Sequence, residues 1–156
     1  MIEIRPTDPR LPAIQALLAA ADAFAQALYP AESNHLDPVD ELIKPNVYFV
    51  GAYLPGADEP VGCGAVKRLR DADGVEYGEI KRMFVAPAAR GLGAGRTLLA
   101  ALESHLTGTG VYLARLETGI HNHAALALYQ GCGYQRIGPF ADYGDDPLSV
   151  FMAKTL

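Results

Sequence analysis

The feature that most constrains this chain is the stretch of residues 78–102, GEIKRMFVAPAARGLGAGRTLLAAL. The pattern predicts a strand, a turn, a glycine-rich loop from Arg90 to Gly95, and a helix that opens at about Gly93. Three alternating glycines let backbone N–H groups approach an anion without obstruction by a Cβ atom. The helix start points its unpaired N–H groups and the positive end of its dipole at the same place. The stretch therefore predicts a phosphate-binding cradle.

Two common phosphate-binding loops do not fit these residues. A Walker A loop needs a lysine after its last glycine, and here Arg96 and Thr97 follow Gly95. A dinucleotide-binding G-x-G-x-x-G loop needs its third glycine at Arg96, and it would lie near the start of a βαβ unit. Most of the predicted strands instead precede the loop. A glycine-rich turn without a ligand is the alternative, but the strand, loop and amphipathic helix together favour the cradle.

The loop resembles the pyrophosphate loop of the GCN5-related N-acetyltransferases (GNAT), R/Q-x-x-G-x-G/A, at Arg90, Gly93 and Gly95. A second motif lies at residues 122–134, NHAALALYQGCGY, and resembles the family pattern N-x-x-A-x-x-L-Y-x-x-x-G-[FY]. Residues 138–152 are similar to a bacterial subgroup of small acetyltransferases. The resemblance covers the chain from about residue 47 to the C-terminus, and the N-terminal third agrees only in layout.

Local patterns predict the order of elements. We expect a strand at 2–4, a helix capped by Asp8 that runs to about Tyr29, and a short helix at 39–44. Strands follow at 46–54, 61–69 and 75–85, then the helix after the loop, a strand at 111–117, a helix that Asn122 caps, and strands at 134–137 and 148–154. The resemblance implies an α/β (α+β) fold and a single N-acetyltransferase domain over residues 1–156. Its mixed, mostly antiparallel sheet has about seven strands and about four flanking helices, and is splayed between the fourth and fifth strands.

Composition limits the classes of partner and the cellular compartment that we expect for this chain. The chain has 156 residues, 50% of them apolar and 20% charged, with a net charge of −5, which argues against nucleic acid. Cys63 and Cys132 form no metal-ligand pattern, so we expect no metal. The chain begins without a basic, apolar leader, and no window has membrane-spanning length. We expect a cytoplasmic protein with reduced thiols and no membrane partner.

The resemblance implies acetyl-CoA as cosubstrate, lying between the splayed strands 79–85 and 112–118. It assigns the pantetheine arm to the backbone of three residues, and the pyrophosphate to the loop with its two arginines. Two residues of the second motif complete the cofactor site. The pantetheine residues are Met83, Phe84 and Val85. The pyrophosphate residues are Arg90, Gly91, Leu92, Gly93, Ala94, Gly95 and Arg96. The two residues of the second motif are Asn122 and Tyr129.

The resemblance also implies direct attack of a neutral amine on the thioester. Tyr129 occupies the position of the family's general acid, and packing or cofactor positioning is its alternative role. Glu79 is the candidate base, with a plain ion pair to Lys81 as the alternative, and Glu117 is the reserve candidate. A strand bulge near residues 83–85 can supply an N–H group to the oxyanion. His121 and His123 are expected to be exposed rather than metal ligands, and His35 to line the acceptor pocket.

The acceptor pocket is expected to lie under residues 29–45 and 139–147, the two regions that vary most in the family. Seven acidic residues in these segments could favour a cationic acceptor, or could be ordinary solvated loop residues: Glu32, Asp37, Asp40, Glu41, Asp142, Asp145 and Asp146. Four aromatic residues could form an apolar wall: Tyr29, Tyr48, Phe140 and Tyr143. The leading hypothesis is transfer to a small-molecule primary amine. A protein or peptide acetyltransferase and a non-catalytic CoA-binding sensor are the alternatives. Homodimers are common in the family, but no stretch specifies an interface.

Overall fold

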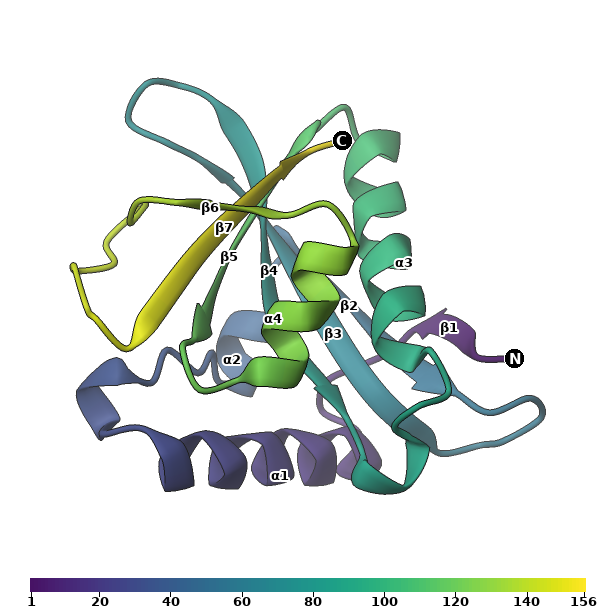
Figure 1. The fold of residues 1–156 in the computed structure, drawn as a ribbon. Helices are drawn as coiled ribbons and strands as arrows, with labels where there is room; N and C mark the ends of the chain where they lie inside the picture. The colour runs from purple at the N-terminus through teal and green to yellow at the C-terminus, as the bar shows by residue number, and fades with distance from the viewer.

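A seven-stranded sheet forms the centre of the computed structural model, which describes residues 1–156 (Figure 1). The strands are β1 (Glu3–Pro6), β2 (Val47–Tyr53), β3 (Pro60–Arg70), β4 (Glu76–Val85), β5 (Leu113–Gly119), β6 (Gln135–Ile137) and β7 (Ser149–Thr155). Their order is β1-β2-β3-β4-β5-β7-β6, and every neighbouring pair is antiparallel except β4 and β5. The predicted mixed, mostly antiparallel sheet is confirmed.

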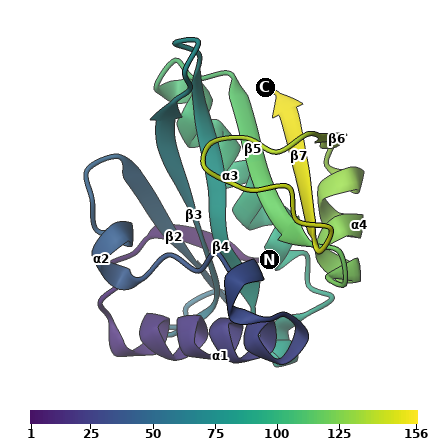
Figure 2. The ribbon, with the colours of Figure 1, turned by 90° about the vertical axis from the view of Figure 1, so that its left-hand side faces the viewer.

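Four α-helices cover the two faces of this sheet: α1 (Pro12–Leu28), α2 (Val39–Leu42), α3 (Ala94–Gly108) and α4 (His123–Gly131). Side chains alternate between the faces along each strand. Val50 and Val66 point into the core with the leucines of α3, whereas Phe49 and Ala65 pack with Ile14 of α1 on the other face. Figure 2 shows α1, α2 and the β6–β7 loop on this second face, with α3 behind the sheet. No helix combines the length and apolar character needed to cross a membrane.

The start of α1 differs from the prediction. The helix begins at Pro12 with Leu11 as the N-cap residue, and Asp8 does not cap it. The Asp8 carboxylate instead accepts hydrogen bonds from the backbone and guanidinium N–H groups of Arg10. A local turn therefore uses the carboxylate that the sequence pattern assigned to the helix.

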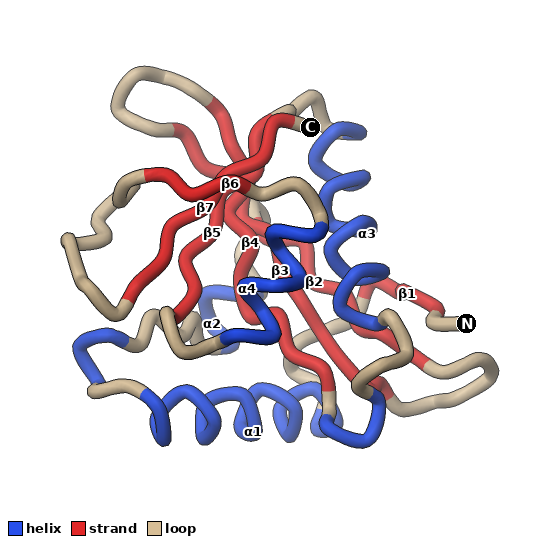
Figure 3. The backbone as a smooth tube through the Cα atoms, viewed as in Figure 1, coloured by secondary structure: helices blue, strands red, loops and turns tan.

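The sheet opens between β4 and β5. These strands pair only at Gly78↔Ala114, Glu79↔Arg115 and Ile80↔Leu116, although β4 continues to Val85 and β5 to Gly119. A bulge accompanies the separation: the register with β3 shifts between Cys63 and Ala65, and Arg82 adopts a left-handed φ of 56°. Bulges bend the strand that carries them. The predicted splay is confirmed, and its bulge comprises Arg82 and Met83, so it overlaps the predicted range 83–85. Figure 3 shows the diverging strands in red.

Candidate active site

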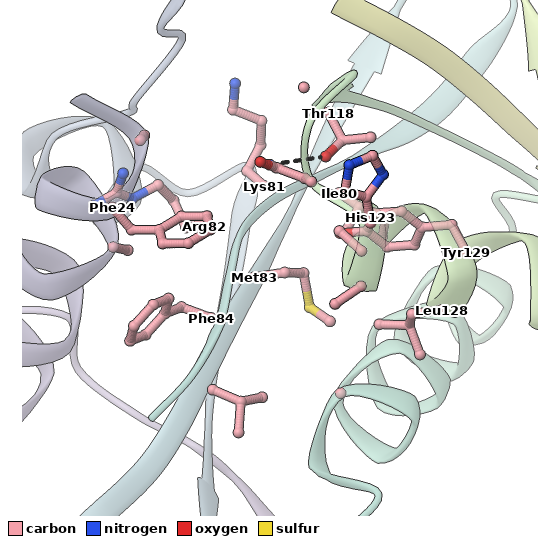
Figure 4. Close-up of a pocket in the computed structure, with 18 of the residues that line it drawn as sticks. Phe24, Ile80, Lys81, Arg82, Met83, Phe84, Thr118, His123, Leu128 and Tyr129 are labelled. Atoms are coloured by element: carbon pink, nitrogen blue, oxygen red, sulfur yellow. Dashed lines mark hydrogen bonds between the residues drawn. The ribbon is translucent and has the colours of Figure 1, made fainter. Parts of the chain in front are cut away.

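A cavity of about 790 Å³ lies where β4 and β5 separate, and it extends from the glycine-rich loop to α4 and the end of α1. This volume is in the usual range for a small-molecule site. Figure 4 shows Met83 and Phe84 of β4 on one side of the cavity and Leu128 and Tyr129 of α4 on the other. All the predicted cofactor-binding residues except Leu92 line it. Leu92 is 55% exposed.

The loop before α3 has the geometry of an anion cradle. Gly91 and Gly93 have φ angles of 83° and 79°, values that favour glycine, and Gly93 is the N-cap residue of the 15-residue helix. The N–H groups of the first helical turn have no carbonyl partner inside the helix, and they face the cavity end lined by Arg90 and Arg96. Backbone donors, a helix N-terminus and two guanidinium groups fit a diphosphate.

The edge of β4 provides a second feature that fits a CoA molecule. Pairing with β5 ends at Ile80, so residues 81–85 present a strand edge without a strand partner on that side. An extended amide chain can add to such an edge through backbone hydrogen bonds. The pantetheine arm has this chemistry, and Met83, Phe84 and Val85 all line the cavity.

Tyr129 lies at the inner end of the cavity. Its side chain packs in the main core, edge-on to Tyr134 at 5.8 Å, and it is 6% exposed. Burial, and to a smaller extent the charge of Glu117, raise the pKa of its hydroxyl, so the group keeps its proton at neutral pH. Tyr129 therefore both packs in the core and lines the cavity.

The two candidate bases occupy different places. In the register of β4 and β5, Glu79 stands opposite Arg115, where the strands are still paired. Its carboxylate accepts a hydrogen bond from the Tyr143 hydroxyl, lies 3.7 Å from the Lys81 amine, and lines a second cavity. The first cavity does not include it.

Glu117 is the first residue of β5 beyond the last pair, Ile80↔Leu116, and it does line the first cavity. Burial raises the pKa of its carboxyl, and a hydrogen bond from Ser149 at 2.8 Å opposes part of this effect. The structure thus brings Glu117, the reserve candidate, together with Tyr129.

Asn122 occupies the N-cap position of α4, but its side chain makes no capping hydrogen bond, so the predicted cap is wrong. Its Oδ1 accepts a hydrogen bond from the Tyr29 hydroxyl at 2.9 Å, and its Nδ2 donates to Thr118 at 3.3 Å. The Tyr29 hydroxyl also accepts a hydrogen bond from the backbone N–H of His121 at 3.0 Å. A Cβ atom at Gly119 would collide with Tyr29. Tyr29 therefore holds the loop before α4 in place, a role that sequence reasoning missed.

Comparison with known proteins agrees with this geometry. The Acetyltransferase (GNAT) family model matches residues 14–134. The chain is 43% identical over 155 residues to an IAA acetyltransferase of Azospirillum brasilense, covering 99% of this chain and 98% of that protein. The chain belongs to the GNAT acetyltransferase family.

Solved structures show the same fold. A Klebsiella pneumoniae protein assigned as an acyl-CoA N-acyltransferase is 40% identical, with a TM-score of 0.80 over 100% of this chain and 98% of that one. The PaiA N-acetyltransferase of Thermoplasma acidophilum, solved with coenzyme A, is 18% identical and has a TM-score of 0.74 over 100% of this chain and 99% of that one. This GNAT protein is an acyltransferase.

The acceptor side of this GNAT protein differs from the expected acidic rim. None of the seven acidic loop residues lines the first cavity. Asp37 is 3.0 Å from the Lys67 amine, and Asp146 accepts a hydrogen bond from Ser33 at 2.6 Å. Of the expected aromatic wall, Tyr29 lines this cavity, whereas Phe140 and Tyr143 line the second one. Tyr48 stacks on His105 of α3 at 3.8 Å, so its assignment to the pocket is wrong.

Three of the four histidines lie around the cavity. His35, His121 and His123 all line it, and no group of three metal-ligating side chains is present anywhere in the chain. The His35 ring meets the Tyr143 ring edge-on at 4.8 Å. His35 therefore lies between the two cavities and lines both of them.

Arg82 is a second residue of this site that no sequence motif predicted. Its side chain is 4% exposed and donates to Asp22 of α1 at 2.6 Å and to the Leu18 carbonyl at 3.3 Å. Its Nε is the only buried side-chain nitrogen or oxygen in the chain without a hydrogen-bond partner. An unsatisfied buried donor costs about 1–3 kcal/mol. The GNAT fold here tolerates that cost beside its ligand cavity.

Proposed function

We propose that this protein is an acetyl-CoA-dependent N-acetyltransferase that transfers acetyl to the primary amine of a small molecule. The observation that carries the proposal is one cavity lined at one end by a diphosphate cradle and at the other by Tyr129 and Glu117. Acetyl-CoA supplies the activated thioester. Binding and catalysis then require only groups that line this cavity.

The residues act on a ternary complex. The amine must be neutral to attack, and the Glu117 carboxylate accepts the proton that the amine nitrogen loses. As the C–N bond forms and the C–S bond breaks, the Tyr129 hydroxyl donates a hydrogen bond to the sulfur that leaves as a thiolate. Burial keeps this hydroxyl protonated, and it also makes the carboxyl of Glu117 a stronger base than a solvated glutamate. Backbone N–H groups at the bulge around Arg82 are the candidate donors to the oxyanion.

The test is release of free thiol from acetyl-CoA in the presence of a panel of primary amines. We expect turnover with at least one small amine, and a strong loss in Glu117→Gln and Tyr129→Phe. Silence across a broad panel, with no binding of CoA, would refute the proposal. A Glu79→Gln variant that loses as much activity as Glu117→Gln, while remaining equally folded, would return the base to Glu79.

One relative favours the peptide alternative. The N-alpha-acetyltransferase RimI of Mycobacterium tuberculosis is 41% identical over 98 residues, which are 63% of this chain and 58% of that protein. Turnover of peptides but not of free amines would support this reading. Tight CoA binding without turnover, and no effect of Tyr129→Phe on function, would support a non-catalytic sensor.

We further propose that residues 1–156 form one acetyltransferase domain that works in the cytoplasm. Both cysteines are free thiols in the structure, and we expect them to stay reduced in that compartment. Thiol-specific labelling in intact cells would show whether Cys132, the less buried of the two, stays reduced there.

A further inference from the structure

The charges around the cavity limit which charged groups an acceptor molecule can carry. The charged residues that line it are four cations, Lys81, Arg82, Arg90 and Arg96, and a single carboxylate, Glu117. Arg90 and Arg96 flank the diphosphate cradle, so Lys81 and Arg82 are the cations of the remaining space. The one carboxylate, Glu117, is the proposed base for the reacting amine. A second ammonium group on the acceptor would find no anionic partner here, which disfavours polyamines and other polycations.

The two cations of the acceptor side differ in their free hydrogen-bonding capacity. The Lys81 amine donates to the His35 carbonyl at 3.2 Å and to the Tyr143 hydroxyl at 3.0 Å, and it lies 3.5 Å from Asp37 and 3.7 Å from Glu79. Two of its three donors are therefore occupied, and two carboxylates lie close to its charge. Arg82 has one carboxylate partner, Asp22, and its Nε–H has none.

The position of Arg82 also suits an acceptor contact. It lies at the bulge where β4 turns away from β5, and its left-handed φ of 56° is uncommon for a residue that carries a side chain. Figure 4 places Arg82 with Phe24 and Phe84 on the α1 side of the cavity, across from Tyr129. Phe24 is 47% exposed although it lines the cavity, so it can move aside as a ligand reaches the guanidinium.

We propose that the acceptor carries a carboxylate beside its amine, as an amino acid does, and that Arg82 binds this carboxylate through its free Nε–H. This inference rests on the proposed acetyltransferase function. Guanidinium groups suit carboxylates because their N–H donors lie in one plane and match the two oxygens. The apolar side chains of Phe24 and Phe84 then face the remainder of the acceptor. Arg82 is thus a specificity-determining residue that binds the acceptor, and it takes no part in proton transfer.

The experiment compares the twenty standard amino acids with their α-carboxamides as acceptors in the thiol-release assay, with spermidine as a polycation. The amide substituent lowers the pKa of the neighbouring amine, so rates are compared per neutral amine. We expect at least one amino acid to exceed its carboxamide by about tenfold or more in kcat/KM, and spermidine to be a poor acceptor. Carboxamides or spermidine that are used as well as, or better than, every amino acid would overturn the proposal.

The variant Arg82→Lys separates recognition from support of the fold. It keeps the charge and removes the planar donor set, so the preference for the acid over the amide should fall about tenfold, mainly through KM for the amino acid. Turnover of the carboxamide should fall much less than that of the amino acid. The matched control is Arg115→Lys, because Arg115 is also partly buried and paired with a carboxylate, Asp71 at 3.3 Å, but lines only the second cavity. An equal loss for acid and amide in Arg82→Lys would mean that Arg82 only supports the fold.

Calorimetry on the CoA-loaded protein measures binding of an amino acid and of its carboxamide without turnover. It therefore tests the carboxylate proposal separately from the acetyltransferase proposal. If no amine is turned over, the acetyltransferase proposal fails, and binding still decides the question of the carboxylate. Binding of an amino acid but not of its carboxamide, lost in Arg82→Lys, would support the inference. Binding of neither compound, or of both equally, would overturn it.

Discussion

The two cavities of this protein share the residues His35, Leu36 and Lys81 but differ in how their polar groups are satisfied. In the second cavity Glu79, Tyr143, Lys81, Asp37 and Lys67 form a continuous network, and Arg115 pairs with Asp71. In the first cavity the Nε–H of Arg82 has no partner. Burial raises pKa values in both cavities, those of Tyr129 and Glu117 in the first and that of Tyr143 in the second.

The difference indicates which cavity binds the reactants. A network whose members satisfy one another contributes to the fold, and it has little free capacity for a ligand. Groups that keep unused donors beside an open space are candidates for function, and Arg82 is such a group. The comparison predicts that substitutions in the first cavity change activity more than stability, and that those in the second cavity do the reverse.

The largest effect is expected from the paired substitutions Glu117→Gln and Glu79→Gln. Loss of the base at Glu117 should lower kcat/KM about 10²–10⁴-fold. Glu79→Gln disturbs the network with Tyr143, so it should lower the melting temperature while kcat changes much less. Steady-state kinetics and thermal unfolding of both variants measure these effects. The reverse pattern would break the distinction between the two cavities.

The pH profile sharpens the same comparison. Glu117 must be deprotonated to act, and burial raises its pKa. With kcat/KM expressed per neutral amine, the rate should therefore fall as the pH drops through a value above the ordinary 4.5 of a glutamate. This acidic limb should disappear from the residual activity of Glu117→Gln and persist in Glu79→Gln. A limb that survives in Glu117→Gln would assign the titration to another group.

An intermediate effect is expected at the cradle. Gly93→Ala places a side chain at φ 79° and should cost about 1–2 kcal/mol of stability. It should also raise KM for acetyl-CoA, because the loop N–H groups shift. Gly110→Ala is the control: its φ is 83°, a Cβ there also meets no neighbour within 4 Å, and it lies beyond the other end of α3. Equal changes of KM in the two variants would count against the cradle.

A smaller effect is expected from Tyr29→Phe. The variant removes the hydrogen bond that fixes Asn122, worth about 1 kcal/mol, so CoA should bind several-fold more weakly. Tyr53→Phe, which removes a hydroxyl contact to Thr7 at 3.1 Å far from the cavity, should leave CoA affinity unchanged. Titration calorimetry with CoA compares them. Unchanged affinity in Tyr29→Phe would limit Tyr29 to packing.

The smallest effect concerns stability and pH. Because the folded-state pKa of Glu117 is raised, its contribution to stability is full below the unfolded pKa near 4.5 and is lost as the pH rises through the folded pKa. Glu117→Gln cannot ionise, so relative to the wild type it should gain stability as the pH rises from about 4.5 toward neutral. Denaturant unfolding at several pH values tests this. A difference that stays constant with pH would show that Glu117 has an ordinary pKa.

Features encoded in contiguous residues could be predicted from the sequence. The loop from Arg90 to Gly95 and the motif that carries Tyr129 depend on local spacing, so β4, the loop, α3 and α4 were predicted at their observed places. The end of pairing at Ile80↔Leu116 depends on a register between strands that are distant in the sequence. That register, rather than residue type, separates Glu117 from Glu79, and no local pattern reports it.

Side-chain partners were the least predictable feature. Asp8 and Asn122 are both residue types that commonly cap helices. The side chain of Asp8 instead forms hydrogen bonds with Arg10, and that of Asn122 with Tyr29. Tyr29 and Asn122 are 93 positions apart. The free Nε–H of Arg82 is equally invisible in the sequence, because it results from the competition of several neighbours for one guanidinium.

Only three residue pairs join β1–β4 to β5, β7 and β6 by backbone hydrogen bonds. The sheet is in this sense two half-sheets connected at one end, and a molecule seated in the opening touches both. Bound acetyl-CoA would then contact both half-sheets and hold them together. By mass action, the resistance of this protein to unfolding should rise with the concentration of its own cosubstrate.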